Sequence, residues 1–331
     1  MSNLTRPERS LLSVPASSER FFAKAAASAA DTIMLDLEDG VAPDQKDTAR
    51  ISAMRAVDAL DWGGKTLLLR VNGLDTPWAY RDLIAAAEGS RRLDGVMVPK
   101  VNAPRDVQFV ETLLAQVEAA TGRARPLTIE VLVETALGLT QVEAIAAASP
   151  RLEAISFGPG DFAADMGTRG RRVGGPDPGY AVLTDPDAAG RRELHWGDAW
   201  HHALARIAVA CRAHGLRPVD GVYVDFQDAE GFRAAARRSR ALGFEGKWCI
   251  HPTQVPLANA VYGPTAEEVE WARGLLAAME QAHGTGAGAI GLGGQMVDMA
   301  HVRQARRILA QAAGQEPQAA GPGKSGPAQA P

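Results

Sequence analysis

The chain has 331 residues, a formal net charge of −4 and 46% hydrophobic residues, which suits a globular protein with one large core or two smaller ones. Positive and negative charges are mixed along the chain, which excludes the basic patch of a nucleic-acid-binding protein, and no apolar run is long enough to span a membrane. The N-terminal segment lacks the apolar stretch of a secretory signal. Because Cys211 and Cys249 form neither a metal motif nor a disulfide framework, we expect a cytoplasmic protein.

Eight short apolar runs, most of them followed by a helical stretch, organise most of the chain. The runs are nearly continuous rather than alternating, as expected for strands buried on both faces of a parallel sheet. In chain order the predicted strands are Leu11–Val14, Thr32–Leu37, Thr66–Val71, Gly95–Val98, Leu127–Val133, Ala154–Phe157, Val219–Val224 and Lys247–Ile250. Eight strand–helix units predict a (β/α)₈ TIM barrel. A doubly wound sheet is the alternative, but the Gly-x-Gly-x-x-Gly signature is missing after the first strand.

Two parts of the chain depart from this rhythm. The segment Gly167–Leu194 is rich in Gly, Pro, Asp and Arg, which predicts a long loop that is either functional or a surface insertion. After the eighth strand, the expected order is a helix near Gln254–Val261, a helix from Thr265 to Ala282, a glycine-rich connection over Gly284–Gly294 and a last helix over Val297–Ala313. We therefore predict a barrel domain over residues 1–262, a helical lid over 263–313 and a disordered tail over 314–331.

Polar side chains follow almost every predicted strand. In a barrel, catalytic groups lie at the carboxyl ends of the strands, so these side chains are expected to meet at one mouth. The set comprises Asp36, Glu38, Asp39, Arg70, Asn72, Lys100, Glu134, Asp161, Asp220, Asp225 and His251. Acidic, basic and imidazole groups therefore converge on a single candidate site.

Glu134 and Asp161 end neighbouring predicted strands and are candidate ligands for one metal ion. Mg²⁺ takes oxygen ligands and often uses only one or two carboxylates besides water and substrate oxygens. No Cys/His cluster in the sequence indicates zinc. The alternative is that each carboxylate caps a helix or pairs with an arginine.

The basic groups at this mouth have competing interpretations. Arg70 suits bidentate recognition of a substrate carboxylate or a developing oxyanion, or forms an ion pair with Glu38 or Asp39. A Schiff-base role for Lys100 would need a lowered pKa, which neighbouring carboxylates oppose, so we favour an ion pair. His251 is either an acid–base group or part of a rigid His-Pro turn.

Taken together in order, these motifs resemble the citrate lyase β-subunit-like (HpcH/HpaI aldolase) family, and within it the malyl-CoA/β-methylmalyl-CoA lyase branch. The resemblance covers about residues 9 to 313. It is carried by the segments Ala30–Asp39, Arg70–Pro77, Val98–Lys100, Val133–Ala136, Gly158–Ala163, Pro218–Gly221 and Gly246–Pro252. The family fold is a (β/α)₈ barrel with a C-terminal helical extension, as expected here from the strand pattern.

The resemblance also implies a site and an assembly. Glu134 and Asp161 match the family's ligands for Mg²⁺, for which Mn²⁺ is a substitute, and Arg70 matches its catalytic arginine. Asp298 matches an aspartate donated by a neighbouring subunit, so we expect a homo-oligomer, a trimer or a hexamer, with shared active sites. Coenzyme A, as part of the substrate, would lie across the barrel mouth. Its phosphates would lie near basic residues around the first strand, Arg9, Arg20 and Lys24, each of which is otherwise a solvated surface charge.

The activity implied is reversible cleavage of (S)-malyl-CoA or β-methylmalyl-CoA to glyoxylate and acetyl-CoA or propionyl-CoA. Alternatives on the same scaffold are a malyl-CoA thioesterase, a citramalyl-CoA lyase and a pyruvate-type aldolase. An alternative of another class is a non-catalytic acyl-CoA-binding subunit of a lyase complex. The stretch Ser13–Ser18 lacks a glycine that the family often has near the substrate, and the loop Arg169–Leu194 differs in detail, so substrate choice stays open.

Overall fold

The computed structural model describes residues 6–170, 172–283 and 288–314 of the chain. The predicted tail from residue 315 onward and residues 284–287 of the glycine-rich connection lie outside the described residues. The described residues divide into two compact units: one runs from Glu8 to Tyr262, and the other begins at Gly263 and also includes Arg6 and Pro7.

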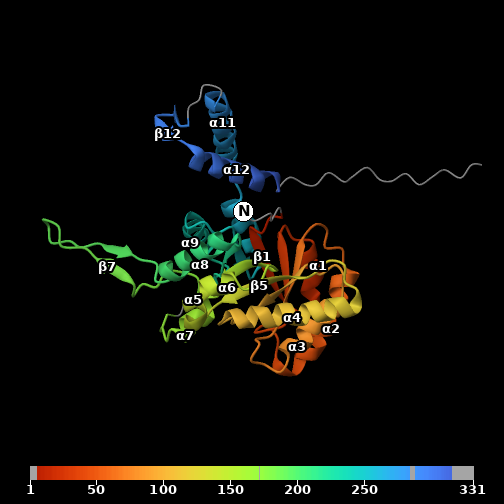
Figure 1. Ribbon diagram of the computed structural model, residues 1–331. Coiled ribbons are helices and arrows are strands. Elements are labelled where there is room, and N and C mark those ends of the chain that lie inside the picture. The colour runs from red at the N-terminus through yellow and green to blue at the C-terminus, as the bar shows by residue number, and fades with distance from the viewer. Residues whose placement is uncertain (1–5, 171, 284–287, 315–331) are drawn as a thin grey trace, which may run out of the picture. The chain divides into compact units, whose positions relative to one another are not determined.

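The first unit is a closed eight-stranded parallel barrel with helices around it, so the predicted TIM barrel is confirmed (Figure 1). Its strands are β1 (Ser10–Pro15), β2 (Thr32–Asp36), β3 (Thr66–Arg70), β4 (Gly95–Val98), β5 (Thr128–Val133), β6 (Leu152–Phe157), β9 (Arg217–Asp220) and β10 (Gly246–Cys249). Around the barrel the order is β1-β10-β9-β6-β5-β4-β3-β2, and pairing of β1 with β10 closes the ring.

Helices and short 3₁₀ turns connect the strands. They are η1 (Glu19–Phe21), α1 (Phe22–Ala26), η2 (Pro43–Gln45), α2 (Lys46–Ala59), α3 (Ala79–Glu88), α4 (Pro104–Thr121), α5 (Ala136–Thr140), α6 (Val142–Ala146), α7 (Pro159–Asp165), α8 (His201–His214), α9 (Ala229–Ala241), η3 (Pro252–Gln254) and α10 (Val255–Tyr262). In α4, Pro104 opens the helix, and the Asp106 carboxylate accepts the free amides of Asn102 and Ala103. Gly122, in the left-handed region at φ 65°, ends it.

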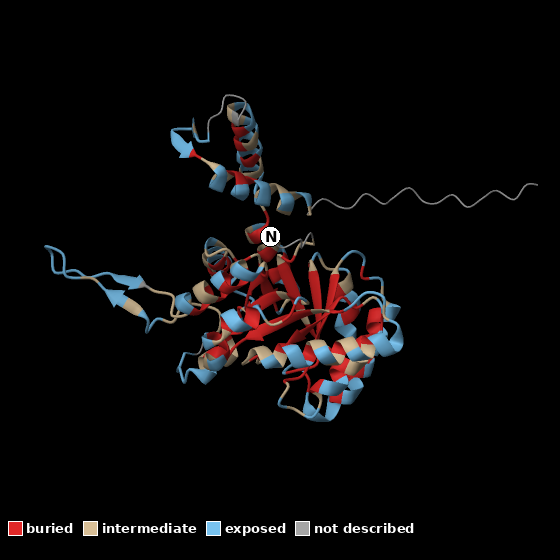
Figure 2. Cartoon of the chain, viewed as in Figure 1, coloured by how far each residue is buried: buried red, intermediate tan, exposed pale blue. Residues whose placement is uncertain are grey.

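The core of this unit has two layers. One side chain from each barrel strand points to the axis and forms an inner cluster: Leu11, Met34, Leu68, Met97, Leu132, Ala154, Val219 and Trp248. The alternate strand residues pack outward against the helices in a larger cluster. Since both faces are covered, the strands are buried almost throughout, which explains their continuous apolar runs (Figure 2).

Two predicted elements of the barrel unit differ in extent. The seventh barrel strand ends at Asp220 rather than Val224. At Gly221 an added Cβ would lie 2.1 Å from the Phe157 carbonyl oxygen, so the chain packs closely there against the end of β6. The segment predicted as a loop after the sixth strand contains β7 (Ala181–Leu183), which pairs antiparallel with β8 (Leu194–Trp196). Strands of three residues are too short to leave a periodic signal in the sequence.

The second unit is a helical hairpin with a small β-ribbon. It contains α11 (Ala266–His283), β11 (Ile290–Leu292), β12 (Gln295–Val297) and α12 (Met299–Ala313). Gly293 and Gly294 link β11 to β12 with positive φ angles of 58° and 79°, as a two-residue type I′ turn requires. The last helix begins two residues later than predicted, at Met299, with Asp298 as its N-cap. In the described parts of the chain, no helix has the length and apolar character needed to cross a membrane.

Candidate active site

Arg70 and Asp36 form the central ion pair at the C-terminal mouth of the barrel. They are register partners at the last positions of β3 and β2. The Arg70 Nε and Nη2 atoms each donate to one Asp36 carboxylate oxygen at 2.7 Å, and Arg70 is only 9% exposed. This bidentate, buried pairing fixes the plane of the guanidinium.

Arg70 has two further neighbours at the mouth. Its Nη1 lies 2.9 Å from Glu38 Oε2, and its guanidinium carbon lies 5.5 Å from the centroid of the Trp248 ring. Burial alone would lower the pKa of Arg70, but Asp36 and Glu38 outweigh it and hold that pKa above its usual value. Arg70 is therefore a permanent positive charge with little exposure to solvent.

Lys100 follows β4 and contacts the other residues of the site through both its backbone amide and its side-chain ammonium. Its φ of 53° places it in the left-handed region, and its amide donates to Glu134 Oε1 at 2.8 Å. Its ammonium donates to Glu38 and lies 3.7 Å from carboxylate oxygens of both Asp39 and Asp161. Burial would lower the pKa of Lys100, but these carboxylates raise it above its usual value. The predicted ion pair is confirmed, and a neutral Schiff-base lysine does not fit this setting.

Glu134 directly follows β5 and is only 2% exposed, whereas the Asp161 side chain, in the first turn of α7, is 44% exposed. A Cβ at Gly158 would lie 2.4 Å from Glu134 Oε2, so a glycine at that position leaves room for the carboxylate. Burial, and then the nearby charges of Asp161 and Glu38, raise the pKa of Glu134 well above its usual value. The pair is an accumulation of negative charge that a cation would relieve.

The donor set fits a hard divalent cation. Among the described residues, Glu134 has no side-chain cation within 4.0 Å, whereas Asp36 and Glu38 are each paired with Arg70. In that same part of the chain, no group of three or more His, Cys, Asp or Glu is placed to hold a metal, which argues against a closed zinc site. Two carboxylates that leave positions for water and substrate suit Mg²⁺.

Over residues 9–252 the sequence matches a known family of carbon–carbon bond enzymes. The chain belongs to the HpcH/HpaI aldolase/citrate lyase family. The family predicted from the motifs is thereby confirmed.

Two curated relatives and one solved structure illustrate the similarity within the HpcH/HpaI family. The L-malyl-CoA/beta-methylmalyl-CoA lyase of Cereibacter sphaeroides is 50% identical over 308 residues, which cover 93% of this chain and 95% of that enzyme. The (3S)-malyl-CoA thioesterase of the same species is 37% identical over 312 residues, covering 94% and 97%. The CitE protein of Mycobacterium tuberculosis, solved in complex with magnesium, acetoacetate and coenzyme A, has 32% identity and a TM-score of 0.71, covering 94% of this chain and 100% of that one.

The three basic residues predicted to bind coenzyme A in this HpcH/HpaI protein lie in two different places. Arg9 precedes β1, and its Nε and Nη2 atoms both donate to Asp31 at 2.8 Å. It therefore lies at the N-terminal end of the strands, opposite the mouth, and the prediction for Arg9 is corrected. Arg20 and Lys24 follow the C-terminal end of β1 in η1 and α1 and are exposed.

Asp298 belongs to the second unit, where it is the N-cap of α12. Its carboxylate accepts the Ala300 amide at 2.9 Å and lies 3.0 Å from His301 Nδ1. The His301 side chain, and then the Ala300 amide, lower the pKa of Asp298. The carboxylate is thus held as an anion at the first turn of α12.

Other residues of the mouth complete the comparison with the sequence predictions. Asp36, rather than Asp39, is the principal partner of Arg70, and Glu38 is a second one as predicted. The signal for Asp36 was its matching position at the end of the strand next to that of Arg70. His251 stacks on Phe226 with ring centroids 4.7 Å apart, and its Nδ1 lies 2.8 Å from Thr253 Oγ1, which favours the rigid-turn interpretation.

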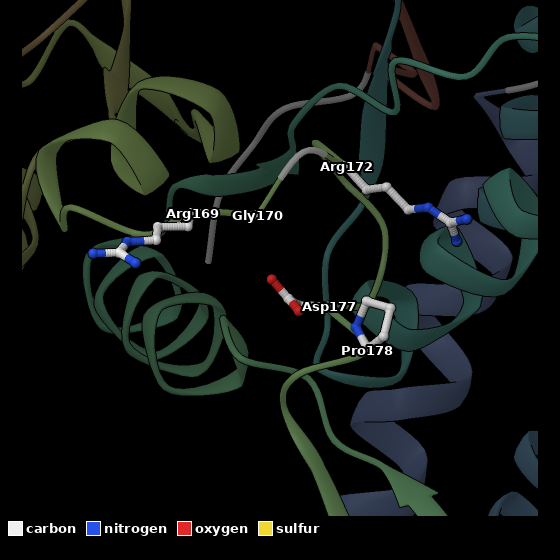
Figure 3. A pocket seen from close by; sticks show the side chains of 5 residues that line it. All are labelled: Arg169, Gly170, Arg172, Asp177 and Pro178. Carbon is white, nitrogen blue, oxygen red and sulfur yellow. The ribbon is translucent and has the colours of Figure 1, made fainter.

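A hollow of about 410 Å³ lies in the insertion between α7 and β7 (Figure 3). It is lined by Arg169, Gly170, Arg172, Asp177 and Pro178. The Val224 amide donates to the Val173 carbonyl at 3.2 Å, which ties this insertion to the loop after β9. Figure 3 shows the Arg169 and Arg172 side chains extending in different directions, so they do not converge on one anion site.

Proposed function

We propose that this protein is a Mg²⁺-dependent carbon–carbon lyase that reversibly cleaves (S)-malyl-CoA or β-methylmalyl-CoA to glyoxylate and acetyl-CoA or propionyl-CoA. The observation that carries the proposal is the juxtaposition of Glu134 and Asp161, short of positive charge, with the fixed Arg70 guanidinium. The 50% identity to an L-malyl-CoA/beta-methylmalyl-CoA lyase along almost the whole chain supports it. The magnesium and coenzyme A bound to the Mycobacterium tuberculosis CitE protein support the same ligands here.

In this proposal, Glu134 and Asp161 hold the ion, for which Mn²⁺ is a substitute. When bound, Mg²⁺ would supply a Lewis acid at the hydroxyl and carboxylate oxygens of the substrate. Arg70, immobilised by Asp36, would bind the developing carbonyl oxygen as a preorganised positive charge. Burial of Arg70 and Glu134 strengthens their interactions, because water screens them less than it screens exposed groups.

As the substrate hydroxyl gives up its proton to solvent, the carbon–carbon bond beta to the thioester breaks. The hydroxyl carbon becomes the aldehyde carbon of glyoxylate, and the electron pair of the bond stays on an acyl-CoA enolate. Asp298 of a neighbouring copy, after taking a proton from solvent, would give it to the enolate carbon, and in the condensing direction its carboxylate would remove a proton from that carbon. The lowered pKa of Asp298 favours the anion that the condensing direction needs. Exposed Arg20 and Lys24, after β1, remain our candidates for the coenzyme A phosphates.

We also propose that the protein is a homo-oligomer, a trimer or a hexamer. The β7–β8 hairpin carries the exposed apolar side chains Val182, Leu183 and Leu194, which are 68%, 50% and 58% exposed (Figure 2). An isolated two-stranded hairpin is marginally stable in water, and a second copy would cover these side chains.

The buried free thiols of Cys211 and Cys249 support a reducing, cytoplasmic location.

Two alternatives use the same mouth. A thioesterase would admit water to the thioester, and the 37% identity to a (3S)-malyl-CoA thioesterase keeps this reaction open; a citramalyl-CoA lyase would differ only in pocket size. A non-catalytic acyl-CoA-binding subunit would not need Arg70, Glu134 and Asp161 at one mouth. The higher identity to the lyase favours carbon–carbon cleavage.

The deciding experiment gives the purified protein (S)-malyl-CoA with Mg²⁺ and, in parallel, with EDTA. Glyoxylate is trapped with phenylhydrazine while free thiol is followed in the same samples. We expect metal-dependent glyoxylate with no early thiol release. Free CoA and malate without glyoxylate would identify a thioesterase instead. If neither product forms, citramalyl-CoA is the next substrate, and inactivity on both would favour the binding-subunit interpretation.

A further inference from the structure

The carboxylates at the mouth outnumber the cations. Arg70 pairs with Asp36 and Glu38, and the Lys100 ammonium also donates to Glu38. Glu38 is therefore shared between two cations. In contrast, the charge of Arg70 acts on Glu134 without a direct ion pair, and the Lys100 ammonium lies 3.7 Å from Asp161 Oδ1. The acidic groups therefore fall into two sets. Asp36 and Glu38 are neutralised by Arg70 and Lys100, and Glu134 and Asp161 are the pair that could hold a metal ion.

Glu38 is nevertheless close enough to affect that pair. It is buried, and its charge is one of the causes that raise the pKa of Glu134. A third carboxylate beside Glu134 and Asp161 would be an ordinary ligand for a divalent cation. What keeps Glu38 out of a three-carboxylate set is its pairing with Arg70 on one side and Lys100 on the other.

The backbone at Lys100 allows one residue to contact both sets. With φ at 53°, a conformation that residues with a Cβ rarely adopt, the amide donates to Glu134 while the ammonium reaches Glu38. The same ammonium lies 3.7 Å from Asp161 Oδ1. Lys100 thus lies between the carboxylates of the proposed metal pair and the carboxylate that must stay apart from it.

We propose that Lys100 is a positioning residue that withholds Glu38 from the metal ion, so that an ion held by Glu134 and Asp161 keeps coordination positions open for substrate oxygens. This inference rests on the proposed Mg²⁺-dependent function. Mg²⁺ demands near-octahedral coordination, so each additional protein ligand removes a position that water or substrate would take. Lys100 also limits metal affinity, because its positive charge lies beside Asp161.

The test measures metal binding without substrate, by calorimetry with Mg²⁺, on the full-length wild type and on Lys100→Met. The substitution keeps the backbone amide that donates to Glu134 and removes the ammonium, with its hydrogen bond to Glu38. We expect Lys100→Met to bind Mg²⁺ at least about 10-fold more tightly, a change of the size that groups surrounding metal ligands produce. Its turnover of malyl-CoA should fall because the substrate loses a coordination position.

A spectroscopic readout separates this role from a merely structural one. Water-proton relaxation with Mn²⁺ in place of Mg²⁺ reports the exchangeable waters on the bound ion. Lys100→Met should show fewer such waters than the wild type, and Lys100→Met/Glu38→Gln should recover the wild-type number and affinity. Lys100→Arg, which keeps the cation, should resemble the wild type, and so should the control Lys65→Met, which removes a lysine just before β3 at the other end of the barrel.

The outcomes distinguish this inference from the function on which it rests. If the wild type binds no Mg²⁺, the proposed function and this inference both fail. If the wild type binds Mg²⁺ but Lys100→Met binds it no more tightly, or Glu38→Gln does not reverse the change, only the role of Lys100 is wrong. Should Lys100→Met not fold, Glu38→Gln alone decides: it frees the ammonium to approach Asp161, and Mg²⁺ affinity should fall, whereas an unchanged affinity would refute the proposal.

Discussion

The two ends of the barrel both bury charged side chains, but they balance them differently. At the N-terminal end, Arg217 pairs with buried Glu8 and lies 3.1 Å from Glu245, which is also 2.6 Å from Arg212. At the C-terminal mouth, Arg70 pairs with Asp36 and Glu38, and Lys100 pairs with Glu38. Among the described residues Glu134 has no side-chain cation within 4.0 Å, and Asp161 has only the Lys100 ammonium at 3.7 Å. Buried charge alone therefore does not mark the active site of this family member; charge left unbalanced does.

The largest expected effect is a loss of stability when the ion pair at the N-terminal end of the barrel is removed. Arg217→Met leaves the Glu8 carboxylate buried without its principal partner, so the free energy of unfolding should fall by about 3–5 kcal/mol. Chemical denaturation monitored by circular dichroism measures this, and turnover by the molecules that remain folded should be unchanged. Arg217→Met/Glu8→Gln is the matched control and should recover part of the loss. A large drop in kcat with intact stability would contradict the division between the two ends.

The next effect concerns catalysis at the mouth. Arg70→Ala removes the fixed positive charge opposite the metal pair, and kcat/KM should fall by about 10²–10³-fold, or roughly 2.7–4 kcal/mol. Arg70→Lys, which keeps the charge but not the bidentate geometry toward Asp36, should be intermediate. Glyoxylate formation measures both variants. An Arg70→Ala enzyme with near-normal activity would refute the proposed assignment.

A smaller effect tests how the metal pair is held. Gly158→Ala places a Cβ 2.4 Å from Glu134 Oε2 and forces that carboxylate to move. Mg²⁺ affinity measured by calorimetry should weaken by about 10–100-fold while the fold is kept. Gly64→Ala is the control, because a Cβ there meets nothing within 4 Å. Equal affinity in the two variants would mean that Glu134 is not a ligand.

The smallest effect is on the pH dependence of stability. Because Glu134 has a raised pKa, the folded protein holds this proton more tightly than the unfolded chain does. Its favourable contribution is complete below the usual value of 4.5 and is lost as the pH rises through the raised folded value. Metal-free Glu134→Gln should therefore gain in Tm over the wild type as the pH increases from 4.5. Thermal melts with Mg²⁺ should reverse this order, and parallel pH profiles without metal would contradict it.

The sequence predicted the barrel well because its strands are buried on both faces and appear as continuous apolar runs. The same property placed Arg70, Lys100, Glu134 and Asp161 at strand ends that meet in space. The extent of a strand was less certain, as where β9 ends at Asp220 although the predicted strand continued to Val224. Whether Glu134 and Asp161 bind a metal stays a prediction.

Other features depend on information that one-dimensional patterns do not contain. Which carboxylate pairs with Arg70 depends on the register of β2 against β3, which aligns Asp36 with Arg70. Arg9 was misplaced because closeness to β1 in the sequence does not tell which end of the strand a residue occupies. The β7–β8 hairpin was read as a loop because its strands are three residues long.

The left-handed backbone at Lys100 has a consequence for protein engineering. A residue with a Cβ pays about 1–2 kcal/mol in this conformation, and glycine would avoid most of that cost. A search for stabilising substitutions would therefore select glycine at position 100, which keeps the amide that contacts Glu134 but removes the ammonium. Such a variant would melt at a higher temperature but would lack the ammonium that contacts Glu38 and Asp161. A screen for melting temperature alone would therefore select a variant with a changed active site.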